Sequence, residues 1–489
     1  MSHLPVLILV VYFAAALLLP LLAKLKNSFP GWGALAVTSL ALLLSIASAL
    51  YVGENGPYSY FPGGHGGPGI EITVDWVTVL MHLTINLVGL LILVYSLGDL
   101  KSELHPDSLP AYYSIYLVML AALNGLVMAG DLFNLYIFIE ICTIAACALV
   151  AIKPGKLCLE AGLKYMFLST LGSGMILLGI GLVYMVTGEL NMGALSEAIP
   201  LAFSSYPWNI YVAMSLFIVG FGIKSALFPL HVWLPDAHAS AAAPSSAIHS
   251  GLIIKVFIIV VARLIFQIFG ANLFAAIPAP EVILLLSTIG IFAGSVLAIA
   301  QTDIKRMLAY STIAQISYIF MGFALAVPSG IMGGLLHIVN HGIMKSMLFL
   351  AAGAIIYKTG IRKIDELRGI GFRMPLTMSI FSIGALSMVG IPGFSGFISK
   401  YYLAFGALEA GKPIYVAVIL ASSLLNAIYY LPIVVRAFLG HKEGKFVWDQ
   451  LPWPMATAMV IMAAFNLLFG ILPGSLLRLV ELAATALLS

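Results

Sequence analysis

The sequence has little charge. Asp, Glu, Lys and Arg make up only 9% of its 489 residues, whereas a soluble domain has about 25%. The net charge of +3 is spread over the whole chain and forms no basic patch. This composition excludes a nucleic-acid binder, a soluble enzyme and a disordered scaffold.

Cysteine is also scarce. The chain has three cysteines, at 142, 147 and 158, and no Cys-x-x-Cys motif, which argues against an iron–sulfur cluster or a zinc knuckle. No water-soluble segment longer than a loop is evident. We therefore expect no cofactor and no metal on this chain, and any redox chemistry would lie on another polypeptide.

Hydrophobic residues are abundant, at 62% of the chain. They form long runs bounded by Gly, Pro and charge, and about 20 apolar residues suffice for one helical membrane crossing. The sequence predicts an all-α polytopic membrane protein with about fourteen spans. The predicted limits are 4–22, 33–52, 76–97, 111–129, 132–152, 160–187, 209–230, 242–268, 281–300, 305–326, 330–357, 374–408, 413–439 and 453–472.

Two of these spans are interrupted by Gly or Pro. The seventh carries Lys224 before Pro229, and the twelfth carries GIPGFSGFISK, which ends on its lysine, Lys400. Because these spans lie five apart, they predict two inverted five-helix units, 111–268 and 281–439. A three-helix segment, 1–110 with an outer loop at 53–75, precedes the units, and a helix with a tail, 453–489, follows them.

The basic residues predict the orientation. Most of the 23 Lys and Arg residues fall on one side of the predicted spans, and Arg263, Lys412 and Arg478 fall on the other. Cytoplasmic loops collect basic residues. We therefore expect a multi-pass protein of an energy-converting cell membrane with both termini outside.

A few ionisable residues fall inside the spans. Such groups cost several kcal/mol each and are functional candidates. Glu140 lies in the middle of the fifth span, and Lys224 is its expected partner, since a nearby lysine allows a buried carboxylate to ionise. The alternative is a static ion pair that only fixes helix packing, although buried pairs rarely stabilise a fold.

Further titratable groups lie inside the later spans. Lys255 follows His249 in the eighth span, and we expect His249, like His231 and His238 in the loop before it, to be an auxiliary residue for proton entry. In the eleventh span His337, His341 and Lys345 share one helix face at i, i+4 and i+8. The full set of predicted relay residues is Glu140, Lys224, Lys255, His337, His341, Lys345 and Lys400. A proton relay fits this set better than packed histidines or a zinc site, because the third group of the stripe is a lysine.

Three loop residues, His231, Asp236 and His238, lie close together in PLHVWLPDAH. We expect them to serve proton uptake or structure, and metal binding is the alternative. The two halves are not equivalent. Glu140 precedes Lys224 by 84 residues, and the same offset before Lys400 reaches Ile316, next to Gln315, with no acid nearby.

Four stretches resemble one known family: 224–255 (KSALFPLHVWLPDAH and onward), 303–318 (DIKRMLAYSTIAQISY), 337–353 (HIVNHGIMKSMLFLAAG) and 387–402 (SMVGIPGFSGFISKYY). They are similar to the antiporter-like subunits of respiratory complex I, Mrp-type Na+/H+ antiporters, membrane-bound hydrogenases and sulfane-sulfur reductases. The similarity covers nearly the whole chain. Length and the lysine at 400 look most like the D-type Mrp subunit or its hydrogenase counterpart.

The resemblance implies a fourteen-helix fold with two inverted units. It also implies that Glu140, Lys224, Lys255 and Lys400 match the family's charged residues, and that His337 and His341 match its central axis. The implied function is proton translocation in a multisubunit complex that is driven by redox chemistry on other subunits, such as a peripheral arm with iron–sulfur clusters. A gradient-driven Na+/H+ antiporter and a structural scaffold are the alternatives. We expect H+ on this chain, with Na+ passing through partner subunits.

Overall fold

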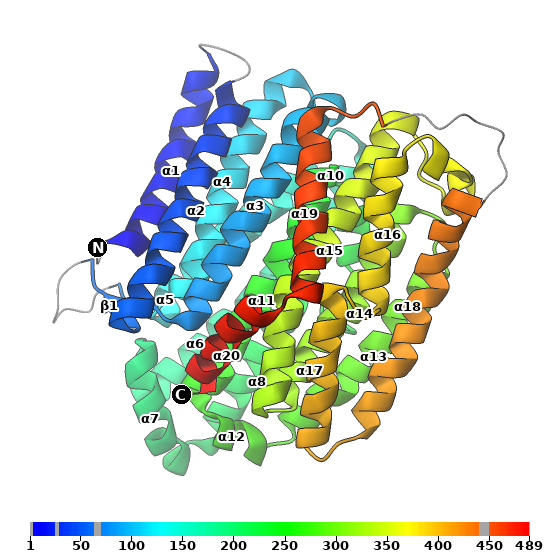
Figure 1. The fold of residues 1–489 in the computed structure, drawn as a ribbon. Helices are drawn as coiled ribbons and strands as arrows, with labels where there is room; N and C mark the ends of the chain where they lie inside the picture. The colour runs from blue at the N-terminus through cyan, green and yellow to red at the C-terminus, as the bar shows by residue number, and fades with distance from the viewer. Residues whose placement is uncertain (1–2, 25–28, 63–69, 440–448, 489) are drawn as a thin grey trace.

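A computed structural model describes residues 3–24, 29–62, 70–439 and 449–488. Within these ranges thirteen helices are long and apolar enough to cross a membrane. They stand side by side in one bundle (Figure 1). The prediction of a helical polytopic membrane protein is confirmed at this level.

The first helices are α1 (Leu4–Ala23), α2 (Phe29–Asn55) and α3 (Trp76–Glu103). Strands β1 (Tyr58–Tyr60) and β2 (Ile72–Val74) pair antiparallel inside the predicted outer loop 53–75. Residues 63–69 of that loop lie outside the described residues. Asp75 caps the start of α3, and its carboxylate accepts a hydrogen bond from the backbone N–H of Thr78.

The next group follows a 3₁₀ turn at Pro106–Ser108. It comprises α4 (Leu109–Met128), α5 (Leu132–Ala151), α6 (Lys156–Thr187), α7 (Met192–Ser205), α8 (Pro207–Lys224), α9 (Leu234–Ser240), α10 (Ala243–Ile248), α11 (Ile254–Arg263) and α12 (Ala271–Ala276). Helix α8 ends at Lys224, before the predicted limit at 230, and turns connect it to α9. Two π-helical segments, His249–Ile253 and Leu264–Phe269, flank α11.

The remaining helices are α13 (Ala279–Ile299), α14 (Ile304–Ala324), α15 (Pro328–Thr359), α16 (Pro375–Val389), α17 (Ser395–Glu409), α18 (Ile414–Leu439), α19 (Trp453–Ile471) and α20 (Gly474–Leu488), with 3₁₀ turns at Ile364–Leu367 and Ile370–Phe372. The predicted span 374–408 is thus two helices, and Gly390 and Gly393 between them have φ of +91° and +90°, a conformation that favours glycine. The predicted tail after 472 is itself a helix, α20.

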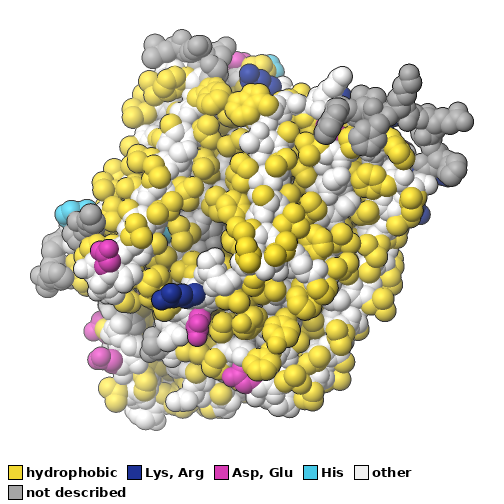
Figure 2. Space-filling model, in the orientation of Figure 1, with side chains coloured by type: hydrophobic (Ala, Val, Ile, Leu, Met, Phe, Trp, Pro, Cys, Tyr) yellow, Lys and Arg dark blue, Asp and Glu magenta, His cyan; other side chains and the backbone are white. Residues whose placement is uncertain are grey.

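Burial separates the centre of the bundle from its rim. The most apolar stretch of α15 is wholly buried and that of α14 is 94% buried, whereas that of α1 is only 22% buried. The face drawn in Figure 2 is covered mostly by hydrophobic side chains, with few charged ones. Polar groups on α14 and α15 are therefore shielded from both water and lipid by other helices.

Candidate functional site

Lys224 is the last residue of α8 and is fully buried. Its Nζ donates hydrogen bonds to Thr143 Oγ1 at 2.8 Å and Ser169 Oγ at 3.1 Å. Glu140 lies one turn before Thr143 on α5 and is only half-buried, and its Oε1 has no hydrogen-bond partner among the described residues. The expected partners therefore lie near each other without an ion-pair contact, because two hydroxyls satisfy the lysine.

Helix α9 and the π-helical segment after α10 bring two predicted auxiliary histidines together. The ring centroids of His238 and His249 lie 6.0 Å apart. The ring nitrogens of His249 lie 2.7 Å from Ser245 O and 2.9 Å from Ala146 O. A neutral imidazole has one N–H, so only the protonated ring donates both hydrogen bonds.

His238 is buried, and both its ring nitrogens lack a partner within the described residues. Desolvation and the neighbouring cationic groups hold the pKa of His238 well below its usual range. His231 stacks on Phe228, while Asp236 pairs with Lys164 and Arg306. The three loop residues do not form a metal-binding group among the described side chains.

Lys255 is the second residue of α11, which follows the first π-helical segment, and is 1% exposed. Its Nζ donates to the carbonyl of Ser250 in that π-helical segment. This segment packs tightly against α15, since a Cβ on Gly251 would lie 2.1 Å from Ser346 Oγ. Lys255 is thereby held beside the histidine-bearing helix, with no acidic ion-pair partner in the described chain.

The predicted stripe on α15 is fully buried. The rings of His337 and His341 stack with centroids 5.5 Å apart and an interplanar angle of 6°. The ring nitrogens of His337 lie 2.9 Å from Ser399 Oγ and 3.0 Å from Gln315 Oε1. Neither nitrogen of His341 has a partner within the described residues, and buried unpartnered groups of this kind are typical binding points for ordered water.

The stripe ends at Lys345, whose Nζ donates to Ser311 Oγ and, at 3.2 Å, to the hydroxyl of Tyr430. Its neighbours come from α14 and α18, so the stripe connects three helices of the second predicted unit. As for Lys255, no acid forms an ion pair with it in the part of the chain described.

Lys400 is placed by the break between α16 and α17. Its Nζ donates to Met388 O at 2.9 Å, to Val389 O at 3.0 Å and to Ser423 Oγ at 3.0 Å. The last carbonyls of a helix have no intrahelical partner and carry partial negative charge. The break therefore supplies the lysine with acceptors that an unbroken helix would not offer.

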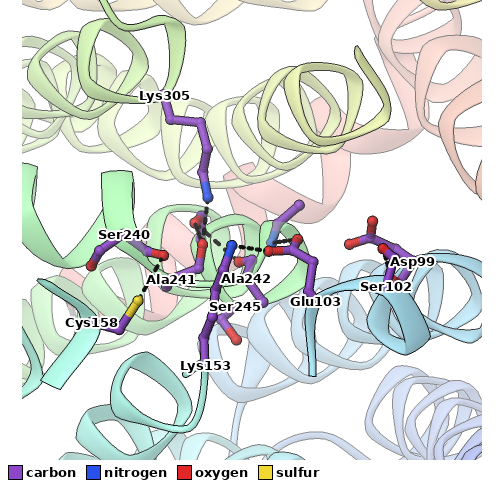
Figure 3. Close-up of polar contacts among 12 residues, drawn as sticks. Asp99, Ser102, Glu103, Lys153, Cys158, Ser240, Ala241, Ala242, Ser245 and Lys305 are labelled. Atoms are coloured by element: carbon purple, nitrogen blue, oxygen red, sulfur yellow. Dashed lines mark hydrogen bonds and ion pairs between the residues drawn. The ribbon is translucent and has the colours of Figure 1, made fainter. Parts of the chain in front are cut away.

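Sequence reasoning missed several buried charges at helix ends. Asp99, Arg263 and Lys305 are 1%, 4% and 2% exposed, although their positions near span ends indicated loops. Arg263 pairs with Asp75 and also donates to the carbonyl of Val127. Asp99 and Lys305 belong to a cluster with Glu103 (Figure 3). The i, i+4 spacing of the two acids was the available signal.

A scan against family models matches residues 129–426 to the family described as NADH:quinone oxidoreductase/Mrp antiporter, transmembrane. The chain is 38% identical over 443 residues to the N subunit of the NADH-quinone oxidoreductase of Desulforudis audaxviator, covering 90% of this chain and 87% of the relative. It is 32% identical to the D-type Na(+)/H(+) antiporter subunit of Alkalihalophilus pseudofirmus, covering 95% and 94%.

Among solved structures, the fold is similar to a chain of the membrane-bound sulfane sulfur reductase, an archaeal respiratory membrane complex. The TM-score is 0.91 at 28% identity, and the match covers 99% of this chain and 98% of the other.

Proposed function

The chain belongs to the NADH:quinone oxidoreductase/Mrp antiporter family of membrane subunits, and from this premise we propose that it translocates protons within a multisubunit ion-pumping membrane complex. One observation carries the proposal. Lys224, Lys255, Lys345 and Lys400 are each at most 5% exposed, and no acid forms an ion pair with any of them within the described residues. Buried, unneutralised lysines are costly, which a packing role does not explain.

The proposed path starts at the basic end of the bundle, near Lys224, His231 and His238. Protons pass by Lys255 to the stripe His337, His341 and Lys345, and leave by Lys400 toward the opposite end. The excess of Lys and Arg at the first end supports placing that end in the cytoplasm and both termini outside.

The path lies across two inverted five-helix units, 111–268 and 281–439. What supports this division is a correspondence between their helices. Both α6 and α15 have 32 residues and end before a left-handed glycine. Asp131 caps α5 and Asp303 caps α14, and each aspartate also forms an isolated antiparallel bridge with a residue after the long helix that follows.

We propose that redox chemistry on other subunits drives the complex, through a peripheral arm with iron–sulfur clusters. The relative named as part of NADH-quinone oxidoreductase and the sulfane sulfur reductase structure support this version. The relative named as part of a Na(+)/H(+) antiporter supports a gradient-driven antiporter as the second candidate. In both, Na+ passes through partner subunits. The composition of the purified complex separates them, since hydrogenase-like or quinone-reductase-like subunits occur only in the first.

The experiment that tests proton translocation is Lys224→Ala in membrane vesicles carrying the complete complex. We expect proton transport to fall about tenfold or more, a loss of about 1.4 kcal/mol in transition-state stabilisation, while assembly is retained. Lys412→Ala is the matched control, because Lys412 is a partly exposed lysine at the opposite end. Unchanged transport in an assembled Lys224→Ala complex would instead identify the chain as a scaffold.

A further inference from the structure

The linker between α9 and α10 is held from two sides by charged residues that the proposed path does not use. Glu103 Oε1, at the end of α3, accepts a hydrogen bond from Ala243 N at 3.0 Å. Lys305 Nζ, in the first turn of α14, donates to Ala241 O. Figure 3 shows both side chains converging on this linker from different helices. The three-helix segment and the second unit thus both hold the linker.

The charged residues behind these contacts form a partly buried cluster. Glu103 Oε2 is ion-paired with Lys153. Asp99 lies one turn earlier on the same face of α3, is 1% exposed, and its Oδ2 has no hydrogen-bond partner among the described residues. Two carboxyl groups thus face two lysines, Lys153 and Lys305. Loss of the negative charge of Glu103 would leave the buried Lys305 without a main counter-charge, which is unfavourable.

The linker also directly follows the wall of a surface cleft, because Ala239 and Ser240 at the end of α9 line that cleft. This cleft, of about 760 Å³, opens at the basic end, and its lining includes Lys153, Ser240 and Cys158. His238, two residues before Ser240, is buried and has no hydrogen-bond partner for its ring among the described residues. Cys158 Sγ donates to Ser240 O at 3.4 Å. A movement of the linker would therefore change both access to His238 and exposure of the Cys158 thiol.

We propose that Glu103, together with Asp99, Lys153 and Lys305, is an electrostatic latch on the α9–α10 linker. When the ion pair between Glu103 and Lys153 breaks, Glu103 also loses its hold on Ala243 N–H. The freed linker then admits water to His238, and the ion pair closes the linker again when it re-forms. Glu103 acts here as a positioning residue, and the inference rests on the proposed proton translocation.

The test is Glu103→Gln in the complete complex in membrane vesicles whose cytoplasmic face is accessible. Glutamine keeps the length of the side chain and an acceptor for Ala243 N, but it has no charge to pair with Lys153. We expect alkylation of Cys158 by a membrane-impermeant maleimide, located by peptide mass spectrometry, to become at least about tenfold faster. Proton transport should fall at least about fivefold, and Glu103→Asp should restore both.

Asp107→Asn is the matched control, because this nearby acid is 91% exposed and makes no contact with the linker. If Glu103→Gln fails to assemble, Lys305→Met tests the latch from the other side, with the same rise in Cys158 labelling expected. Unchanged labelling in an assembled variant overturns the latch. Since labelling is read without transport, this failure differs from that of the proposed function, which appears as normal transport in Lys224→Ala.

Discussion

Helices α6 and α15 have the same length but differ in chemistry. At three corresponding positions of their 32 residues, α6 carries Tyr165, Ser169 and Ser173, while α15 carries His337, His341 and Lys345. One helix presents neutral hydroxyls and the other presents titratable groups. Two helices of the same length therefore have different roles. Helix α6 accepts a hydrogen bond from a lysine of α8, whereas α15 itself carries the protonatable side chains.

Helices α5 and α14 also differ, but here the helix of the first proposed unit carries the ionisable side chain. Each starts at a capping aspartate, Asp131 or Asp303. Nine residues later α5 has Glu140, whereas α14 has Thr312, whose hydroxyl bonds to Ser250. Among the described residues, only the first proposed unit therefore places an acid near its lysine. We infer that the first unit, besides carrying part of the proposed path, responds to a neighbouring charge.

The largest effect on proton transport is expected from a substitution where the two proposed units adjoin. Lys255→Met removes the titratable group beside α15 and keeps its volume. We expect proton transport to fall to the level of vesicles without the complex. The thermal unfolding temperature should stay the same or rise, because replacing a buried charge by an apolar group is often neutral or stabilising. A lower unfolding temperature with normal transport would assign Lys255 to packing.

A smaller effect is expected at the acid itself. In Glu140→Gln, Lys224 keeps its hydrogen bonds to Thr143 and Ser169. We therefore expect transport to fall about fivefold, equivalent to about 1 kcal/mol of lost electrostatic interaction. Thr312→Ala, at the corresponding position of the second unit, is the control. Equal losses in both variants would remove the proposed asymmetry.

The smallest effect is expected on α6. Ser169→Ala removes the longer of the two hydrogen bonds that Lys224 donates, at 3.1 Å, while the bond to Thr143 Oγ1 at 2.8 Å remains. Transport measured in the same vesicles should fall by less than about fivefold. Ser173→Ala should have no effect, because the Ser173 hydroxyl lacks a partner in the described structure. A complete loss in Ser169→Ala would show that the hydroxyl stripe is itself part of the conducting path.

Much of this organisation could be predicted from sequence because it depends on local patterns. The i, i+4, i+8 spacing of His337, His341 and Lys345 placed them on one face, and apolar runs located most helices. The end of α8 at Lys224 was harder, since the apolar run continues beyond it. Helix α20 was missed because it is short and amphipathic, and not uniformly apolar.

Contacts between distant residues could not be predicted in this way. Whether the ammonium of Lys224 contacts the Glu140 carboxylate or two hydroxyl groups depends on how α5, α6 and α8 pack. Likewise, Glu103 contacts Ala243 across 140 residues of sequence. Glu103 and Ala243 both lie near the ends of hydrophobic runs, where the composition alone indicates that side chains are exposed to solvent.

The most direct test of proton conduction along α15 is to measure proton flux in vesicles carrying the complete complex with His341→Gln. Glutamine can hydrogen-bond in the buried site but cannot take up a proton near neutral pH. If His341 passes protons between Lys255 and the rest of the stripe, flux falls at least about tenfold while assembly and the unfolding temperature are retained. Normal flux in an assembled His341→Gln complex would contradict conduction through α15.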